Sequence, residues 1–167
     1  MENFDNQIVD LLPRLLRYAR SLSRNMPEAD DLVQDTLEAA MKGKSNWRGI
    51  NFKSWMMTIM TNVYRNRHRN GFKPSMMVGL EDASEVSIEI PVSDPFERDR
   101  LWAAINALPA DYRAVLMLVA VEGYKYSEVA AMLAVPLGTV MSRLSRARKL
   151  LTERLRLNNV ISLRSHP

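Results

Sequence analysis

Serines and arginines recur between residues 138 and 154 at the spacing of one helix face. Short hydroxyl side chains let a helix backbone approach another surface closely, and arginines donate hydrogen bonds to guanine edges and phosphate oxygens. This combination suits binding to DNA rather than catalysis. At about 100° per residue these polar side chains lie opposite or beside an apolar stripe. They are Ser142, Arg143, Ser145, Arg146, Arg148 and Lys149.

A helical corner is predicted to position this basic face. A short helix should begin near Tyr126 with Ser127 as its N-cap, and Pro136 should force a break at residues 134–135. A second helix should run from about residue 137 to about 154. Two helices with a sharp corner and a basic second helix are typical of the helix-turn-helix, whose second helix enters the DNA major groove. The predicted apolar stripe of this second helix contains Val140, Leu144, Ala147 and Leu151.

An ordinary helical hairpin with a solvated basic face would give a similar pattern. The break and the basic face coincide, however, and this coincidence favours DNA binding.

Composition excludes several other classes of function. The chain has 167 residues and no cysteine, and its two histidines, His68 and His166, are far apart. A disulfide framework and a zinc or iron site are therefore not expected. We find no nucleophile–base pair and no phosphate-binding glycine loop, so we expect no enzyme and no cofactor. No apolar run approaches the roughly 18 residues that span a membrane. The N-terminus carries Glu2 and Asp5 and no basic segment, which is not typical of a signal peptide. A cytoplasmic protein without membrane insertion is therefore expected.

Charge alternates along the chain although the net charge is only +4. Residues 28–38 are acidic, and every charged residue from 42 to 73 is basic. Residues 81–99 are again mostly acidic, and residues 143–156 mostly basic. Two basic surfaces separated by an acidic stretch predict two contacts with nucleic acid.

The N-terminal part is predicted to contain two amphipathic helices, residues 8–24 and 28–41. Pro13 is placed in the first turns of the first helix, where proline is tolerated. The helix dipole explains the carboxylates in the first turn of the second helix, but it does not explain Asp35 and Glu38, which lie further along. An exposed acidic face for a basic partner is the sharper interpretation. Its outward residues are Asp31, Gln34, Asp35 and Glu38.

Aromatic residues alternate with basic ones in the predicted loop 42–51 and the predicted helix 52–69. An aromatic ring can stack on an unpaired base while a nearby cation holds its phosphate, as single-stranded nucleic acid requires. Trp55 lies on the apolar stripe and is expected in the core. Trp47 and Phe52 are the better candidates for base contacts.

The predicted fold class is all-α, with two small helical domains joined by a flexible linker and a helix-turn-helix in the C-terminal domain. A short helix over residues 99–107 is expected to turn Leu101, Trp102, Ile105 and Leu108 inward. An apolar helix should cover residues 112–121 and end at Gly123. The predicted divisions are 1–72 and 98–157 for the domains, 73–97 for the linker and 158–167 for a disordered tail.

Several motifs together resemble a known family. Residues 29–36 (ADDLVQDT) resemble the second conserved region of bacterial sigma factors, and residues 52–62 resemble the next part of that domain. Residues 108–113, 126–130 and 138–148 resemble the fourth region. Their order, and the lack of a central domain, resemble the extracytoplasmic-function (ECF) subgroup of the sigma-70 family.

The resemblance implies three binding surfaces. The acidic second helix, with Asp31, Gln34, Asp35 and Glu38, would bind the clamp helices of core RNA polymerase. The loop and third helix would recognise and open the promoter −10 element, flipping out a base at a cost of a few kcal/mol. The candidates for that role are Trp47, Arg48, Phe52, Asn62, Arg65 and Arg67.

The C-terminal domain would recognise the −35 element. Thr139 would hold a phosphate near the helix start, and Met141 stands where many relatives carry a basic residue. The remaining candidates for the −35 element are Ser142, Arg143, Arg146 and Arg148.

The resemblance also implies an anti-sigma factor that covers these surfaces. Two alternatives stay open: a sigma-like decoy that binds an anti-sigma factor, and a stand-alone helix-turn-helix regulator. A decoy has no need for a basic recognition helix. A stand-alone regulator leaves the acidic helix and the aromatic–basic loop unexplained.

Overall fold

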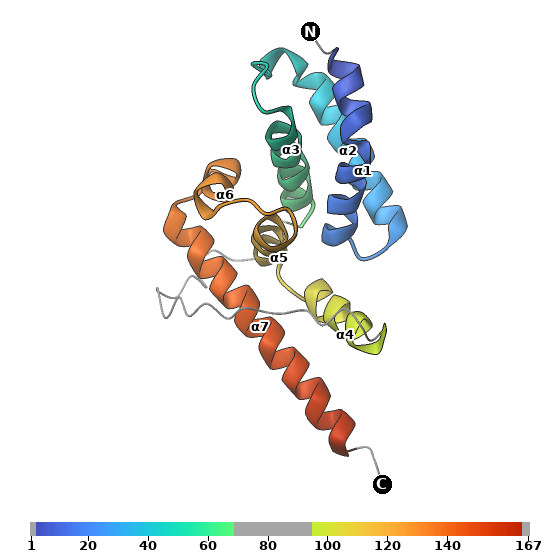
Figure 1. Ribbon diagram of the computed structural model, residues 1–167, viewed down its shortest axis with the longest axis vertical. Coiled ribbons are helices and arrows are strands. Elements are labelled where there is room, and N and C mark those ends of the chain that lie inside the picture. The colour runs from blue at the N-terminus through green and yellow to red at the C-terminus, as the bar shows by residue number, and fades with distance from the viewer. Residues whose placement is uncertain (1–2, 69–94, 165–167) are drawn as a thin grey trace.

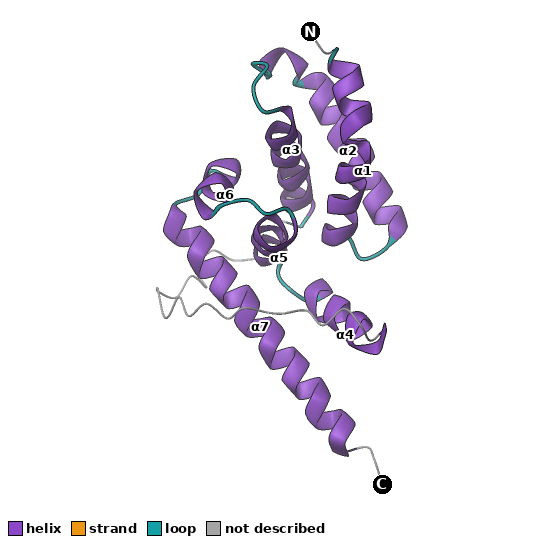
Figure 2. Ribbon diagram, viewed as in Figure 1, coloured by secondary structure: helices purple, strands orange, loops and turns teal. Residues whose placement is uncertain are grey.

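A computed structural model describes residues 3–68 and 95–164, with side chains described as far as residue 156 in the last helix. These ranges contain helices and no strands (Figures 1 and 2), which confirms the all-α prediction. The longer helices are α1 (Phe4–Leu22), α2 (Met26–Lys42), α3 (Phe52–Arg67), α4 (Pro95–Asn106), α5 (Ala110–Leu116), α6 (Tyr126–Leu133) and α7 (Leu137–Arg164).

Helices α1, α2 and α3 form an N-terminal bundle. Its centre holds a hydrogen bond of 2.7 Å between the hydroxyls of Tyr18 and Thr61, both buried. The bundle side of α3 carries three completely buried methionines, Met56, Met57 and Met60. Methionine is unbranched and flexible, so it fills irregular space between helices.

Helix α1 begins at Phe4, earlier than the predicted start at Ile8. The Phe4 ring is buried against the rings of Phe52 and Trp55, and this packing extends the helix by one turn. Pro13 consequently lies in the helix interior rather than in its first turns, so that prediction was wrong.

The C-terminal half is built around α5, which lies between α3 and α7 (Figure 1). The predicted continuous helix over residues 112–121 is instead α5 followed by a wide turn, η4 (Met117–Val121). Glu122 N–H bonds to the Met117 carbonyl five residues back, which gives the turn its π geometry. Gly123 follows with φ +73°, as the predicted helix end requires.

Helices α6 and α7 form the predicted helix-turn-helix. Ala134 adopts the left-handed conformation at φ 53°, and Val135 N–H bonds to the Ala130 carbonyl at 3.0 Å. The break thus falls where Pro136 predicts it. The stripe Val140, Leu144, Ala147 and Leu151 is buried, as predicted.

Two details of this motif differ from the prediction. Lys125, not Ser127, occupies the N-cap position of α6, and no side chain caps it. Helix α7 continues to Arg164, where a disordered tail was expected from residue 158.

Helix α4 starts at Pro95, so residues 95–97 of the predicted linker form its first turn. Ile105 and Leu108 are buried as predicted, but Trp102 is 36% exposed and does not face the core. The rest of the predicted linker, residues 73–94, lies outside the described residues.

Candidate nucleic-acid interface

Among the α7 residues predicted to bind DNA, Ser142 and Arg146 lie opposite the buried stripe, and Arg143 and Arg148 flank that stripe on its two sides. Arg143 is 9% exposed, whereas Thr139, Ser142, Arg146 and Arg148 are half-buried. The Ser142 hydroxyl donates to the Thr139 carbonyl at 3.1 Å. Arg146 Nη1 lies 3.5 Å from the Tyr112 hydroxyl. Short polar side chains and cations therefore share one face, which suits close approach to a DNA groove.

One carboxylate joins the two predicted DNA-binding halves. Asp111, at the start of α5, accepts a hydrogen bond of 2.7 Å from Arg65 Nε on α3. Its other oxygen lies 3.9 Å from Arg143 Nη2 on α7. Arg65 also donates to the Leu133 carbonyl at 3.5 Å. A predicted −10 arginine and a predicted −35 arginine are thus held by the same aspartate.

The electrostatics of Arg143 follow from this burial. Desolvation lowers the pKa of its guanidinium, and the Asp111 charge partly opposes that effect. The Arg143 Nε and Nη1 atoms are buried and have no hydrogen-bond partner among the described residues. Arg143 is therefore a group that gains hydrogen bonds if it leaves this position for another acceptor.

A second arginine, Arg113, crosses from α5 to the end of α1. It is 2% exposed. Its Nε donates to the Ser21 carbonyl at 2.8 Å and its Nη2 to the Ser23 carbonyl at 3.0 Å. Burial lowers the pKa of this guanidinium, but arginine starts so high that it stays charged at neutral pH. These bonds fasten the C-terminal half to the N-terminal bundle.

The predicted −10 candidates are divided between packing and solvent. Phe52 is 9% exposed, and its ring lies 5.0 Å from that of Trp47. Trp47 Nε1 donates to the Ile50 carbonyl at 3.3 Å. These two aromatic rings pack together, whereas Arg48 and Asn62 are exposed.

The acidic face of α2 is present and exposed at Asp31, Gln34 and Glu38. Asp35 is half-buried because Arg67 Nη2 pairs with its carboxylate. The same Arg67 atom lies 3.4 Å from the Asp31 carbonyl. Arg67, predicted for the −10 element, is therefore attached to the face predicted for the polymerase.

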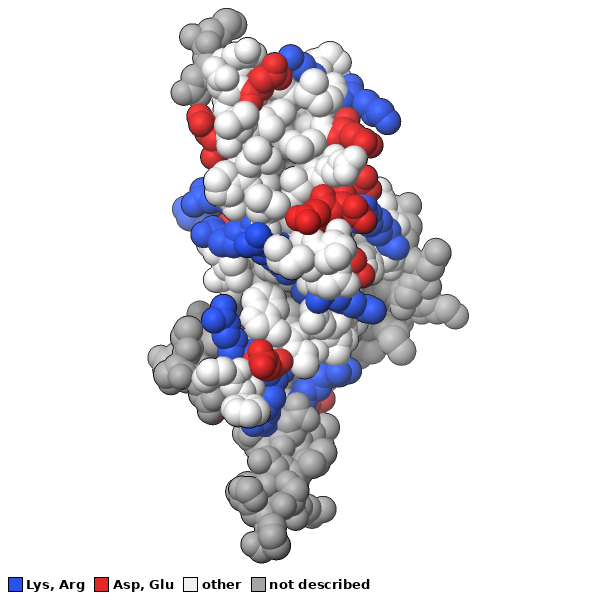
Figure 3. Space-filling view, turned by 90° about the vertical axis from the view of Figure 1, so that its right-hand side faces the viewer, with Lys and Arg blue, Asp and Glu red and all other residues white. Residues whose placement is uncertain are grey.

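A groove of about 500 Å³ lies between α1 and α4 and was not predicted. Arginines of both helices line it, together with the exposed Trp102. Figure 3 shows several basic side chains across the middle of this side of the molecule. No local pattern in the sequence points to the groove, because its residues come from distant segments. The arginines are Arg17, Arg20, Arg24 and Arg98.

The part of the chain that the structure describes holds no group of three or more side chains suited to a metal ion. Within the same residues, no helix is both long and apolar enough to cross a membrane.

Comparisons with known proteins match both halves of the chain. The family model Sigma-70 region 2 matches residues 8–71, and the model Sigma-70, region 4 matches residues 98–151. The ECF RNA polymerase sigma factor EcfG of Rhodopseudomonas palustris is 33% identical over 157 residues, covering 90% of this chain and 84% of EcfG.

A second relative is the ECF RNA polymerase sigma factor SigE of Mycolicibacterium smegmatis, 32% identical over 160 residues. The match covers 93% of this chain but 62% of SigE. The fold is similar to a chain in the co-crystal structure of the sigma factor RpoE in complex with the anti-sigma factor NepR from Bartonella quintana. The TM-score is 0.66 at 33% identity, over 93% of this chain and 98% of that one.

Proposed function

This chain belongs to the ECF group of the sigma-70 family, and on this basis we propose that it binds core RNA polymerase and directs it to specific promoters. It performs no catalysis of its own and acts in the cytoplasm, where the polymerase is. The observation that carries this proposal is the occurrence of both sigma regions in order on one chain.

The α7 face is proposed to bind the −35 element. Val140, Leu144 and the rest of the stripe anchor the helix in the core, which leaves its polar face for the major groove. Arg146 supplies a base or phosphate contact, and Thr139 lies at the helix start, where backbone N–H groups favour a phosphate. The full proposed set is Thr139, Ser142, Arg143, Arg146 and Arg148.

The N-terminal bundle is proposed to bind the polymerase and the −10 element. Asp31, Gln34 and Glu38 are exposed on one helix, as a contact with a basic partner requires. Arg48 and Asn62 are exposed beside the third helix, where they can reach single-stranded DNA. The remaining proposed residues are Asp35, Trp47, Phe52, Arg65 and Arg67.

An anti-sigma factor is the proposed regulator, because the similar RpoE chain is in complex with the anti-sigma factor NepR. A decoy that binds an anti-sigma factor is the second candidate, and the pairing of Arg65 and Arg143 with Asp111 favours it in this one respect. The basic face of α7 favours the sigma factor, since a decoy has no use for it.

The test is co-elution with core RNA polymerase on a sizing column, followed by run-off transcription on fragmented DNA from the source organism. Stable co-elution with discrete transcripts is expected. Failure of the pure, folded chain to bind core would contradict the proposal and point to the decoy.

Arg146→Ala is expected to weaken discrimination at the −35 element by about 1–3 kcal/mol if Arg146 makes a bidentate base contact. The measurement is run-off transcription from matched and −35-mutated promoters. Lys125→Ala, an exposed cation outside α7, is the control and should leave the ratio unchanged. An unchanged ratio for Arg146→Ala would remove this residue from base recognition.

Glu38→Arg is expected to weaken binding to core polymerase about tenfold, because it places a cation on a face proposed to meet a basic partner. Glu38 is exposed and has no ion pair among the described residues, so the fold should be unaffected. Binding is measured by fluorescence anisotropy. Asp10→Arg, an exposed charge reversal on α1, is the matched control. Equal affinity of the two variants would exclude this part of α2 from the interface.

A further inference from the structure

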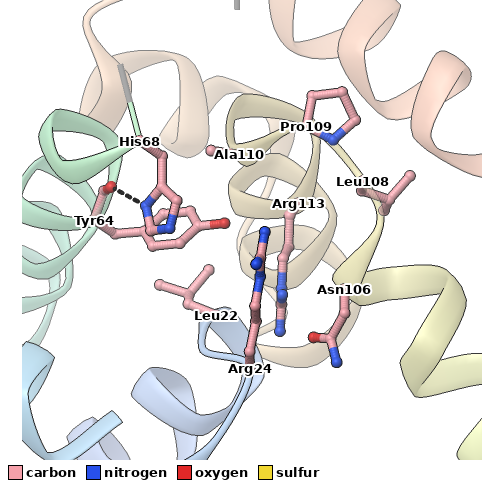
Figure 4. Close-up of a pocket in the computed structure, with 9 residues that line it drawn as sticks. All are labelled: Leu22, Arg24, Tyr64, His68, Asn106, Leu108, Pro109, Ala110 and Arg113. Carbon is pink, nitrogen blue, oxygen red and sulfur yellow. Dashed lines mark hydrogen bonds between the residues drawn. The ribbon is translucent and has the colours of Figure 1, made fainter. Parts of the chain in front are cut away.

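A small cavity of about 180 Å³ lies where the two halves of the chain meet (Figure 4). Its volume is far above the roughly 15 Å³ that one water molecule needs. Three segments form its wall: the end of α1, the end of α3, and the chain from α4 into α5. It is therefore a junction pocket whose lining belongs to both sigma regions.

The side chains that line the pocket include two arginines and no acidic residue. Figure 4 shows the guanidinium groups of Arg24 and Arg113 side by side in it, near the Tyr64 hydroxyl. Burial lowers the pKa of Arg113, Tyr64 and Glu28 partly oppose that effect, and the neighbouring charge of Arg24 adds to it. No carboxylate lines the pocket, and neither arginine has a salt bridge within the described ranges. Glu28 lies outside this lining, where its carboxylate accepts from the Arg24 backbone N–H at 3.0 Å. Two adjacent guanidiniums with no carboxylate in the pocket itself are an arrangement that an anion would stabilise.

Two further polar groups face the same space. His68 Nδ1 donates a hydrogen bond to the Tyr64 carbonyl at 2.8 Å, which leaves its Nε2 without a partner among the described residues. Asn106 Oδ1 is buried and has no hydrogen-bond partner in the described part of the chain. A ligand that both accepts from arginine and donates to an amide oxygen would satisfy the whole wall.

We propose that this pocket binds a small phosphate-type oxyanion, with Arg24 and Arg113 as donors and Asn106 as the acceptor of its P–OH group. The shared chemistry is a phosphate group carrying a proton, which either free hydrogen phosphate or a small phosphate monoester supplies. Arg113 is pre-positioned, because two of its N–H groups are already held by the Ser21 and Ser23 carbonyls. Arg24 is exposed and completes the pocket from the turn between α1 and α2.

A bound oxyanion would hold the two halves together, because its contacts come from both. It would thereby favour the arrangement in which Asp111 pairs with Arg65 and Arg143. Because Arg65 and Arg143 are proposed to bind promoter DNA, the anion would thereby hold them away from it, and this part of the inference rests on the proposed function. The binding itself does not, so it can be tested without polymerase or DNA.

The first test is thermal unfolding of the full chain in increasing inorganic phosphate, with sodium chloride at matched ionic strength as the reference. A saturable rise in the midpoint with phosphate alone is expected, since a ligand that binds only the folded state stabilises it. Arg24→Gln should weaken the apparent affinity about tenfold or more, because it removes a charge-assisted hydrogen bond. Arg20→Gln, which changes an exposed arginine in the last turn of α1 outside this pocket, should bind as the parent does. Equal shifts in phosphate and chloride, or equal binding by the two variants, would overturn the proposal.

Methyl phosphate distinguishes the two sources. A rise in the midpoint with methyl phosphate as large as with inorganic phosphate supports a monoester, and a rise with inorganic phosphate alone supports the free anion. The effect of phosphate on the distance between the two halves is measured separately. Energy transfer is recorded between dyes on Asn46→Cys and Lys149→Cys, in a chain that has no other cysteine. Phosphate should narrow the distance distribution in the parent and not in the Arg24→Gln background. Narrowing in both backgrounds would show that the pocket is not its cause.

Discussion

Asp111→Asn is expected to tighten binding of the isolated chain to a −35 duplex by up to about thirtyfold. The substitution removes the one carboxylate that pairs with both Arg65 and Arg143, and leaves two cations facing each other. All three side chains are at most 24% exposed, so solvent screens their repulsion only in part. Loss of a charge-assisted bond costs about 2 kcal/mol, which corresponds to about a thirtyfold shift between closed and open arrangements.

The measurement is fluorescence anisotropy with a duplex that carries the −35 element found by run-off transcription. Asp99→Asn makes the same change of charge at an exposed site on α4 and serves as the control. If the two variants bind DNA equally, the aspartate does not restrain the arginines. If Asp111→Asn binds more weakly than the parent, Asp111 positions Arg143 for DNA instead.

Arg113→Met is expected to reduce the free energy of unfolding by about 3 kcal/mol or more. Methionine can replace the apolar stem of the arginine side chain. It cannot replace either of the hydrogen bonds that Arg113 donates to the Ser21 and Ser23 carbonyls. Each bond involves a charged donor, worth about 1.5–3 kcal/mol, and a buried carbonyl left without a donor adds a cost of its own.

Urea denaturation followed by circular dichroism measures this loss. Arg100→Met, at a half-buried site on α4, is a useful comparison because it removes the same side-chain charge from another helix. A loss below about 1 kcal/mol for Arg113→Met would mean that the two halves do not depend on this side chain. Arg113→Lys, which keeps the charge but not the two-pronged geometry, should fall between the parent and methionine.

Local patterns were sufficient for the helix-turn-helix. The position of Pro136 predicts the break, and the three- and four-residue spacing of Val140, Leu144 and Leu151 predicts the buried stripe. Gly123 likewise predicts its own positive φ. These features depend on residues close together in the chain, where backbone sterics and periodicity decide the outcome.

The errors arise where a distant contact overrides a local preference. Phe4 extends α1 because it packs on an aromatic cluster that includes Phe52, 48 positions away in the sequence. Trp102 was expected inward by its apolar character, yet it borders the groove between α4 and α1. The π turn at Met117–Val121 has no signature in an apolar run, because such a run suits either kind of helix.

The junction between the halves was also beyond local reasoning. Asp111 at a helix start has a sufficient explanation in the helix dipole, so nothing in the sequence points to Arg65, which lies 46 positions away. Arg113 likewise looks like one more cation on a helix. Only the packing of α5 against α3 and the hydrogen bonds of Arg113 to the end of α1 show that both residues join one half of the molecule to the other.

The buried methionines of α3 connect the fold to oxidation. Met56, Met57 and Met60 are inaccessible to solvent, so peroxide can reach their sulfur atoms only when the bundle opens. Once formed, methionine sulfoxide is polar and cannot return to the apolar interior without cost. Each opening of the bundle in the presence of an oxidant would therefore oxidise these methionines and hinder refolding. The sulfoxide content at these three positions then measures how often the N-terminal bundle has unfolded.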